Sequence, residues 1–307
     1  RHEAIQCTRC LMNVETARTL CEITSNFYRE NAASFSSTRH ASWAGWRRCL
    51  DEMGLGVGLP SDASAGGRPG GASPGGSRPE SGRPEGAPTE DAPSAIGQLP
   101  GEPLRVLDVA CGNGRFLRFL QEALPGAAIA CFAVDNCEQL AREGLAGNAG
   151  NVTFQKLDIA KSLIDGTIEH ALTAPPVDMA VCFGFFHHIP GADSRAALLR
   201  ALVASVRPGG YVAVSLWQFA KSPDLAAKAV ETTARAQAEY GLLALDEGDR
   251  LIGWQNRPHA YRYCHTFSDE EVADLARTVD GRASLVARFE ADGRTGSMNS
   301  YLVFRRL

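Results

Sequence analysis

A glycine-containing loop and three acidic residues form the most specific chemical pattern in this sequence. Residues 106–116 read Val-Leu-Asp-Val-Ala-Cys-Gly-Asn-Gly-Arg-Phe, with Gly112 and Gly114 between an apolar run and a predicted helix. Glycine lets the backbone approach a ligand closely, and the first N–H groups of a helix favour an anion. Asp135 and Asp158 end the next two apolar runs, where they can accept hydrogen bonds from ribose hydroxyls and an adenine amino group. This spacing predicts a nucleoside pocket.

The same loop counts against a dinucleotide such as NAD. A dinucleotide-binding loop has the spacing G-x-G-x-x-G/A, but the third residue after Gly114 is the bulky Leu117. Asp108 lies on the apolar run directly before the loop, which places a third carboxylate beside the glycines. The alternative that these residues leave open is a Rossmann-like core whose site has another use or none.

Four features together resemble the class I S-adenosylmethionine-dependent methyltransferases. They are the loop, Asp135, Asp158 and an Arg-Pro-Gly-Gly turn at 207–210. The resemblance implies S-adenosyl-L-methionine as the cofactor, and it implies nothing about the methyl acceptor, because this fold serves many substrates. The cofactor-binding residues that we predict are Asp108, Ala110, Gly112, Gly114, Asp135, Asn136, Asp158, Ile159 and Phe183.

Two further segments resemble one family of tRNA methyltransferases. Residues 27–43 read Phe-Tyr-Arg-Glu-Asn-Ala-Ala-Ser-Phe-Ser-Ser-Thr-Arg-His-Ala-Ser-Trp, similar to the segment before the core in wobble-uridine methyltransferases that esterify a 5-carboxymethyl group. That family occurs in fungi and in the methyltransferase part of an AlkB homologue. Residues 249–254 and 261–267 are similar to its D-x-x-x-P-W and R-Y-Y-H motifs, with Gly253 in place of proline and Cys264 in place of tyrosine. The resemblance implies that the methyl acceptor is a carboxylate on a modified tRNA uridine, and that tRNA is a partner. It leaves open whether a small activator subunit is needed.

Methyl transfer to a carboxylate sets modest chemical demands. A carboxyl group with a pKa of about 4 is already ionised at neutral pH and needs no general base. It does need alignment and removal of water, which cationic hydrogen-bond donors can supply. We predict Arg39 and Arg262 as these donors, with His187, His188 and His265 as supporting groups. For each of them, a structural role in capping or packing is the alternative.

An unstacked base also needs an aromatic surface on which to lie. The residues that we predict for substrate binding are Trp43, Trp254, Tyr261 and Tyr263, together with Ser37 and Thr38 from the matched segment. No metal site is expected, because Cys7 and Cys10 form a single CxxC without a second pair at metal spacing.

Alternating apolar and amphipathic stretches must position these groups. The predicted strands are Leu104–Ala110, Ala128–Val134, Val152–Leu157, Asp178–Phe183 and Tyr211–Leu216, with helices such as Arg115–Leu124 and Ser194–Val206 between them. Two late runs, Ser284–Phe289 and Ser300–Phe304, are expected to form an antiparallel pair. The pattern predicts a doubly wound α/β fold with a mostly parallel, seven-stranded, Rossmann-like sheet.

A change in composition divides the chain. Residues 54–102 contain 13 of the 31 glycines and 8 of the 16 prolines and no aromatic residue, which predicts a disordered linker. The linker separates an N-terminal helical segment, 12–53, from a methyltransferase domain, 103–307. We expect the segment to dock on the domain, and residues 1–11 to lie upstream of the fold.

Composition excludes several other classes of protein. The net charge of −4 argues against nucleic-acid binding through bulk positive charge. No signal peptide or apolar run of about 18 residues is found, so a cytoplasmic location is expected. The nine cysteines are scattered through apolar stretches, as expected of reduced, buried thiols. Two alternatives to the tRNA enzyme stay open: a methyltransferase for small carboxylic acids or metabolites, and a cofactor-binding scaffold without turnover.

Overall fold

The computed structural model describes residues 12–38, 41–56, 102–148, 150–242 and 245–307. The predicted linker lies outside these ranges except at its ends, as do residues 1–11 and the predicted catalytic residue Arg39. In the part of the chain that is described, no helix has both the length and the apolar character that spanning a membrane requires.

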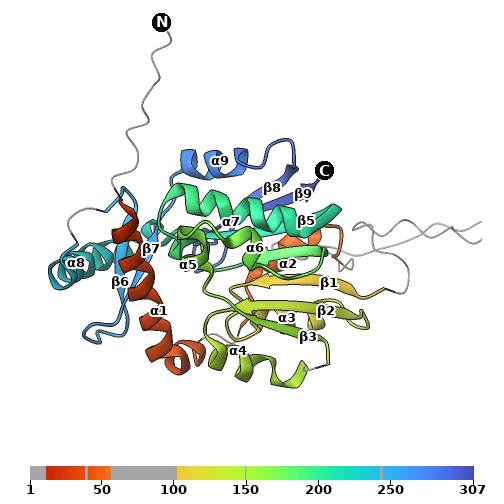
Figure 1. Cartoon of the computed structure of the whole chain (residues 1–307), viewed down its shortest axis with the longest axis horizontal. Coiled ribbons are helices and arrows are strands. Elements are labelled where there is room, and N and C mark those ends of the chain that lie inside the picture. Colours follow the sequence, from red (N-terminus) through yellow and green to blue (C-terminus); the bar gives the residue numbers. More distant parts are fainter. Residues whose placement is uncertain (1–11, 39–40, 57–101, 149, 243–244) are drawn as a thin grey trace, which may run out of the picture.

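A seven-stranded sheet forms the centre of the protein (Figure 1). Its strands are β1 (Leu104–Val109), β2 (Ile129–Asp135), β3 (Val152–Lys156), β4 (Val177–Cys182), β5 (Val206–Trp217), β8 (Ala283–Ala291) and β9 (Asn299–Arg306). They lie in the order β3-β2-β1-β4-β5-β9-β8, with β9 antiparallel to both of its neighbours and the other pairs parallel. This confirms the predicted doubly wound, mostly parallel, Rossmann-like α/β sheet, including the antiparallel pair near the C-terminus.

The Arg-Pro-Gly-Gly segment predicted as a turn lies near the beginning of β5, which starts at Val206 directly after the preceding helix. Val206 pairs with Val177 and Tyr211 pairs with Met179, so residues 207–210 bulge out of the pairing with β4, and Gly209 has a φ angle of +83°. A side chain at Gly210 would bring its Cβ to 2.5 Å from the carbonyl oxygen of Asp178. The segment is therefore a turn-like irregularity inside the strand, and close contact with β4 requires Gly210.

Helices cover both faces of the sheet. They are α1 (Val14–Ser36), α2 (Ala44–Glu52), α3 (Arg115–Ala123), α4 (Glu138–Leu145), α5 (Ile159–Ile164), α6 (Ile168–Ala171), α7 (Ala192–Ser205), α8 (Pro223–Tyr240) and α9 (Asp269–Arg277). Alternate residues of β1 belong to two cores: Leu107 and Val109 pack with residues of α5, α7 and α9, whereas Leu104 and Val106 pack with residues of α2 and α3. This burial on both faces explains the nearly continuous apolar character of the central strands.

A second, two-stranded sheet lies beside α1 (Figure 1). Its strands β6 (Asp249–Gly253) and β7 (Tyr261–His265) are antiparallel, and α8 packs on β6 while α1 packs on β7. Leu20 and Ile23 of α1 share an apolar core with Leu251 and Tyr263. The sequence analysis did not predict this unit, which brings α1 and β7 together although more than two hundred residues separate them.

Candidate functional site

The glycine loop connects the carboxyl end of β1 to the first turn of α3. Gly112 and Gly114 have φ angles of +54° and +65°, in the left-handed region that favours glycine. A Cβ at Gly114 would also lie 2.5 Å from the side chain of Leu145, so the loop passes close against α4. The local sequence therefore explains both the tight turn and the close packing of the loop.

Asp135 holds this loop against the end of β2. Its two carboxylate oxygens accept hydrogen bonds from the backbone N–H groups of Gly112, at 2.9 Å, and Cys137, at 2.8 Å. Burial raises the pKa of Asp135, and the backbone donors oppose the rise. Asp158 caps the next helix by accepting from the N–H of Lys161 at 2.9 Å. Both carboxylates therefore have fixed orientations at neighbouring strand ends.

Asp108 is the most perturbed carboxyl group of the loop region. It is 3% exposed, and burial together with the nearby Asp135 raises its pKa to about 7, while Arg115 opposes the rise. The guanidinium of Arg115 lies over two neighbouring indole rings, 4.8 Å from Trp43 and 4.9 Å from Trp46. A carboxyl group with this pKa changes charge near neutral pH.

A cavity of about 420 Å³ opens at the carboxyl ends of the central strands. Parallel strands in this topology bring their carboxyl ends to one edge, where ligands of open α/β sheets bind. Eight of the nine predicted cofactor residues line the cavity: Asp108, Ala110, Gly112, Asp135, Asn136, Asp158, Ile159 and Phe183. Gly114 does not line the cavity, but its backbone conformation forms part of the loop that does. The residues present thus provide backbone N–H groups, carboxylates and an apolar surface that fit a nucleoside.

Helix α1 forms part of the cavity wall beside the glycine loop. The Asn136 side chain donates to the Ser25 hydroxyl at 3.3 Å, and the Asn113 side chain donates to the Ser36 hydroxyl at 2.9 Å. These bonds join α1 to the glycine loop and to the loop after β2. The segment before the linker is therefore part of the cavity wall in this structure.

Arg262 of β7 lines the same cavity, beside Phe35 and Trp217. It is 5% exposed, and four aromatic rings surround its guanidinium at 5.2 to 5.9 Å: Phe27, Phe35, Trp217 and Trp254. Its Nη1 atom is buried and has no hydrogen-bond partner among the described residues. A buried cation with an unsatisfied donor is costly unless an anion pairs with it. The part of the cavity next to Arg262 is therefore suited to an anionic group.

His187 and His188 follow β4 in a short 3-10 turn and also line the cavity. The His187 ring packs against Trp217, with ring centroids 5.2 Å apart, and against His188. Atom Nδ1 of His188 lies 2.6 Å from the carbonyl oxygen of Tyr263, and its Nε2 lies 2.9 Å from the Tyr28 hydroxyl. His188 thus links α1 to β7 across the cavity wall.

The same region contains one group of potential metal ligands among the described residues. His187, His188 and Cys264 each offer an atom within 4.8 Å of the others. The carbonyl of Tyr263 accepts a hydrogen bond from Nδ1 of His188, so that nitrogen carries a proton and cannot ligate a metal. Burial raises the pKa of Cys264 to about 12, although Arg262 lowers it, so the sulfur is a thiol at neutral pH. Both features, and the adjacent guanidinium, disfavour a cation here.

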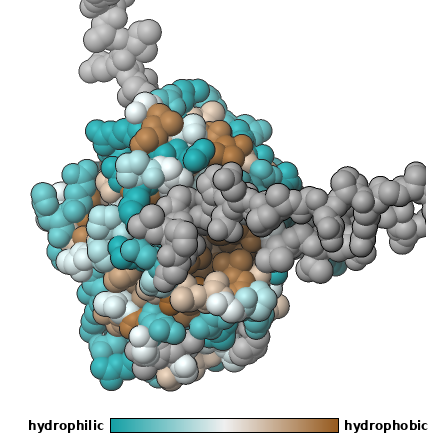
Figure 2. All heavy atoms as spheres, turned by 90° about the vertical axis from the view of Figure 1, so that its right-hand side faces the viewer, coloured by the Kyte–Doolittle hydropathy of each residue, from teal (hydrophilic) through white to brown (hydrophobic). Residues whose placement is uncertain are grey.

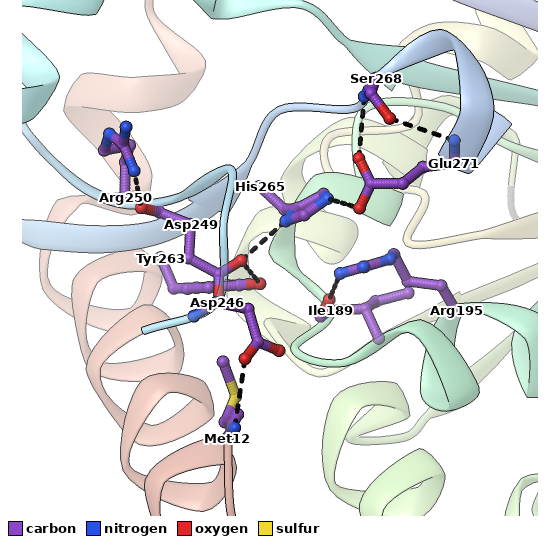
Figure 3. Close-up of polar contacts among 10 residues, drawn as sticks. All are labelled: Met12, Ile189, Arg195, Asp246, Asp249, Arg250, Tyr263, His265, Ser268 and Glu271. Carbon is purple, nitrogen blue, oxygen red and sulfur yellow. Dashed lines mark hydrogen bonds and ion pairs between the residues drawn. The ribbon is translucent and has the colours of Figure 1, made fainter. Parts of the chain in front are cut away.

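His265, predicted as a supporting catalytic group, is not among the residues that line the cavity. The residue is 1% exposed, and its ring is held between the carboxylates of Asp249, at 2.7 Å, and Glu271, at 3.1 Å (Figure 3). The Tyr263 hydroxyl donates to the same Asp249 oxygen at 2.6 Å. Successive side chains of a strand point to opposite sides, so Arg262 faces the cavity while Tyr263 and His265 face away from it.

Among the other predicted substrate residues, one lines the cavity and the rest do not. Trp43 lines the cavity, whereas Tyr261 packs on the far side of β7 against Tyr240. Trp254 forms part of the ring cluster around Arg262 and donates from Nε1 to Ser34, without reaching the cavity wall. Ser37 and Thr38 are exposed at the end of α1, where their hydroxyls bond to backbone carbonyls of the helix. Of these residues, Trp43 is the one that lines the cavity.

Two cavity residues were missed as functional candidates. The sequence analysis did not select Tyr28, although it lies in the matched segment 27–43, and it did not select Trp217. Trp217 is the last residue of β5, at the same sheet edge as the glycine loop. Its position at the carboxyl end of a central strand was the signal that could have identified it.

The opposite edge of the sheet has a different character. A smaller cavity of about 250 Å³ lies at the amino ends of β1, β2 and β3, between Pro103 and Thr153. Figure 2 shows this side of the molecule, where apolar side chains gather in a hollow next to residues drawn in grey. Among the described residues, its lining contains no charged side chain.

Comparisons with known proteins agree with this geometry. A family model described as a methyltransferase domain matches residues 86–280. A solved structure described as "DhpI-SAM-HEP complex" has a TM-score of 0.51 and 17% identity over 93% of this chain and 97% of that chain. The structure described as "DhpI-SAH complex structure" gives 0.50 and 15%, over 95% and 98%. A search of curated proteins gives no match. At these identities, the structural likeness shows a shared fold.

Proposed function

We propose, since this chain belongs to the methyltransferase-domain family, that it transfers the methyl group of S-adenosylmethionine to the carboxylate of a small organic acid. The observation that carries the proposal is the buried guanidinium of Arg262, with an unsatisfied donor, in the wall of the cavity that the glycine loop also lines. A guanidinium can bind a carboxylate through two parallel hydrogen bonds. The acceptor class thus follows from the charge and geometry of one residue.

The chain's own residues have separate tasks in this reaction. When bound, S-adenosylmethionine supplies a methyl group on a positively charged sulfur. Asp135 and Asp158 would accept hydrogen bonds from the hydroxyl and amino groups of its nucleoside, and the backbone N–H groups of the loop would face its carboxylate. Arg262 would align the acceptor carboxylate while the surrounding aromatic rings exclude water. An ionised carboxylate has no proton to lose, so this reaction needs no base.

This proposal treats residues 12–53 and 103–307 as one catalytic unit. Tyr28 and Phe35 of α1 line the same cavity as Asp108 and Arg262. An acceptor that fills this space would contact α1 on one side and β7 on the other. Residues on both sides of the linker would therefore determine which acid is accepted.

A tRNA acceptor bearing a carboxymethyl group on its wobble uridine is the second candidate. It is favoured by the resemblance of residues 27–43 and 261–267 to the enzymes of that modification, and by Trp43 in the cavity wall. It requires the same Arg262–carboxylate pair. The net charge of −4 and the position of Tyr261 and Tyr263 away from the cavity make the small acid the better-supported acceptor.

Labelled cofactor distinguishes these acceptors. The full chain is incubated with methyl-labelled S-adenosylmethionine and either a panel of small carboxylic acids or total tRNA, and each product is treated with alkali. A methyl ester releases labelled methanol, whereas methyl groups on nitrogen or ether oxygen are retained. Alkali-labile label in the acid panel supports the proposal, and label in tRNA alone supports the second candidate. Alkali-stable label in every product overturns the carboxylate acceptor.

A further inference from the structure

The indole nitrogen of Trp46, in the first turn of α2, is a buried donor that has no hydrogen-bond partner among the residues that the structure describes. Trp46 is 2% exposed, yet it is one of the residues that line the cavity at the carboxyl edge of the sheet. An indole N–H can only donate, and a buried donor that stays unpaired is costly. A ligand in the cavity that offers an acceptor atom would remove this cost.

Helix α2 is fixed against the sheet, which also fixes the position of Trp46. The backbone N–H of Gly45 donates to the carboxylate of Asp292 at 3.1 Å. The same carboxylate accepts from the Tyr301 hydroxyl at 2.6 Å and from the Asn299 side chain at 2.8 Å, so Asp292 has three donors of its own. A Cβ at Gly45 would clash with the Tyr301 ring. Glycine at this position therefore allows the close packing on β9 that places Trp46 beside the cavity.

Trp46 lies on the β1 and β4 side of the cavity, away from the groups that suit the nucleoside. Its ring packs against Phe116 in the first turn of α3, with ring centroids 5.4 Å apart, and against Phe183 directly after β4, at 5.8 Å. Asp135 and Asp158 lie at or just after the ends of β2 and β3, on the other side of β1 in the strand order. A cofactor whose nucleoside binds there would extend its amino-acid part across the glycine loop toward Trp46.

The surroundings of Trp46 favour an anion. The guanidinium of Arg115, the first residue of α3, lies 4.9 Å from the centre of the Trp46 ring. Gly114, directly before it, has no side chain that could cap the first N–H groups of the helix, and these groups carry partial positive charge. The carboxylate of the cofactor's amino-acid part fits here, whereas its ammonium group would be repelled by Arg115. The ammonium group would instead meet Asp108, which lines the same cavity from β1.

We propose that Nε1 of Trp46 donates a hydrogen bond to the carboxylate of the amino-acid part of S-adenosylmethionine. Trp46 is then a cofactor-binding residue that the segment before the linker supplies, in addition to the groups at the strand ends. This inference rests on the cofactor of the proposed function and not on its acceptor. It makes α2 an element that recognises the part of the cofactor that the nucleoside pocket does not reach.

Two ligands that differ by one group test this contact. S-adenosylhomocysteine carries the carboxylate, whereas S-adenosyl-3-thiopropylamine keeps the nucleoside, the sulfur and the ammonium group but lacks the carboxylate. Calorimetry gives the Kd of each ligand for the wild-type chain and for Trp46→Phe, which keeps an aromatic ring and removes the donor. We expect the Kd of S-adenosylhomocysteine to rise about 20-fold, the worth of one hydrogen bond to a charged group. The Kd of the analogue should change little.

Phe119→Leu is the matched control for packing. Phe119 contacts the Trp46 ring, with centroids 5.6 Å apart, and belongs to the same apolar core, but it does not line the cavity. Its substitution should change the affinities for the two ligands by the same factor. A second measurement on the wild-type chain does not depend on the folding of Trp46→Phe. The indole N–H resonances of isotope-labelled tryptophan are recorded by NMR and assigned by replacing the other tryptophans one at a time. The Trp46 resonance should move downfield with S-adenosylhomocysteine and not with the analogue.

The outcomes separate this inference from the proposed function. Trp46 has only a packing role if Trp46→Phe weakens both ligands equally and the two ligands shift the Trp46 resonance alike, and the inference is then overturned. An unchanged Kd for S-adenosylhomocysteine overturns it as well. Neither result bears on the ester product, so the proposed acceptor would stand. Conversely, absence of any methyl ester in the labelling experiment overturns the acceptor and leaves the Trp46 contact intact. If the wild-type chain does not bind S-adenosylhomocysteine, both are overturned.

Discussion

The two ends of the cavity are built in different ways. At the loop end, the chemistry lies within residues 108–160, where three successive strands each end in a carboxylate or a turn. At the acceptor end, the wall combines Tyr28 of α1, His188 after β4, Trp217 of β5 and Arg262 of β7. The first end depends on local backbone geometry, and the second depends on how distant elements pack. A local pattern can therefore identify the cofactor while leaving the acceptor open.

The two ends also differ in charge. Among the described residues, the loop end holds the carboxyl groups of Asp108, Asp135 and Asp158 and the guanidinium of Arg115, whereas the acceptor end holds the Arg262 guanidinium. Asp292 also lines the cavity. A cationic methyl donor and an anionic acceptor would each meet the opposite charge. Because the two ends would bind different ligands, substitutions at one end should leave ligand binding at the other end unchanged.

The largest effect is expected from Arg262→Met, which removes the cation but keeps an apolar side chain. Loss of a buried, charge-assisted pair costs about 4 kcal/mol, so kcat/KM for the acid should fall about 1,000-fold. Arg262→Lys should recover part of this loss, since it restores the charge without the planar fork. Steady-state kinetics with the best acid of the panel measure both variants.

Arg235→Met on the exposed face of α8 is the matched control and should have no effect on kinetics. Cofactor binding, measured by calorimetry, should be unchanged in Arg262→Met. An equal loss of cofactor affinity would show that the two ends are not separate.

The contrast explains how much of the site could be predicted from the sequence. Apolar runs ending in Asp108, Asp135 and Asp158 predict parallel strands, and parallel strands of this topology bring their carboxyl ends to one edge. No knowledge of side-chain packing is needed for that step. For this reason, the fold and the loop end of the cavity could be predicted from the sequence.

The acceptor end could not be predicted from the sequence, because the sequence does not show to which side each β7 side chain points. Tyr261 to His265 are all buried, so the strand lacks the alternation of apolar and polar residues that normally shows which face is inside. Arg262 and His265 were equally plausible as cavity residues. The structure separates them because β7 packs against α1 and presents Arg262, but not His265, to the cavity, which depends on contacts between distant segments.

The next largest effect is expected from His265→Asn, which tests whether β7 needs its polar anchor. Both ring nitrogens of His265 lie within hydrogen-bond distance of carboxyl groups, Asp249 at 2.7 Å and Glu271 at 3.1 Å (Figure 3). The hydrogen bond from His265 helps to lower the pKa of Glu271 to about 2, against the effect of burial. Removing the ring leaves the buried Asp249 carboxyl group without one of its hydrogen-bond partners, at a cost of about 3 kcal/mol in the free energy of unfolding. Urea denaturation measures the loss.

Asp249→Asn combined with His265→Asn is the informative companion, because it also replaces the carboxyl group that the single variant leaves without this partner. The double variant should be more stable than His265→Asn alone. If the single variant unfolds like the wild type, the network does not anchor β7. Cofactor affinity, which belongs to the other end, should be unaffected by either change.

At the loop end, Asp135→Ala should weaken cofactor binding. Two charge-assisted hydrogen bonds to ribose hydroxyls are together worth about 3 kcal/mol, so the dissociation constant of S-adenosylhomocysteine should rise about 100-fold. Asp135→Asn, which retains one acceptor oxygen, should have an intermediate effect. Calorimetry measures both variants. An unchanged dissociation constant would remove the ribose contact from the proposed mechanism.

The smallest effect is a pH dependence that belongs to the loop end alone. Burial and Asp135 raise the pKa of Asp108 from 3.8 to about 7, so this group is neutral below that value and charged above it. A cationic methyl donor prefers the charged form, so its affinity should fall about tenfold between pH 8 and pH 6. The free protein should show the opposite trend: a raised carboxyl pKa contributes stability at low pH that is lost as pH rises through 7. Asp108→Asn should remove both trends, and an acid bound at Arg262 should not reproduce them. A pH-independent cofactor affinity in the wild type would mean that Asp108 does not face the bound donor, and the division of charge between the two ends would then rest on Asp135 and Arg262 alone.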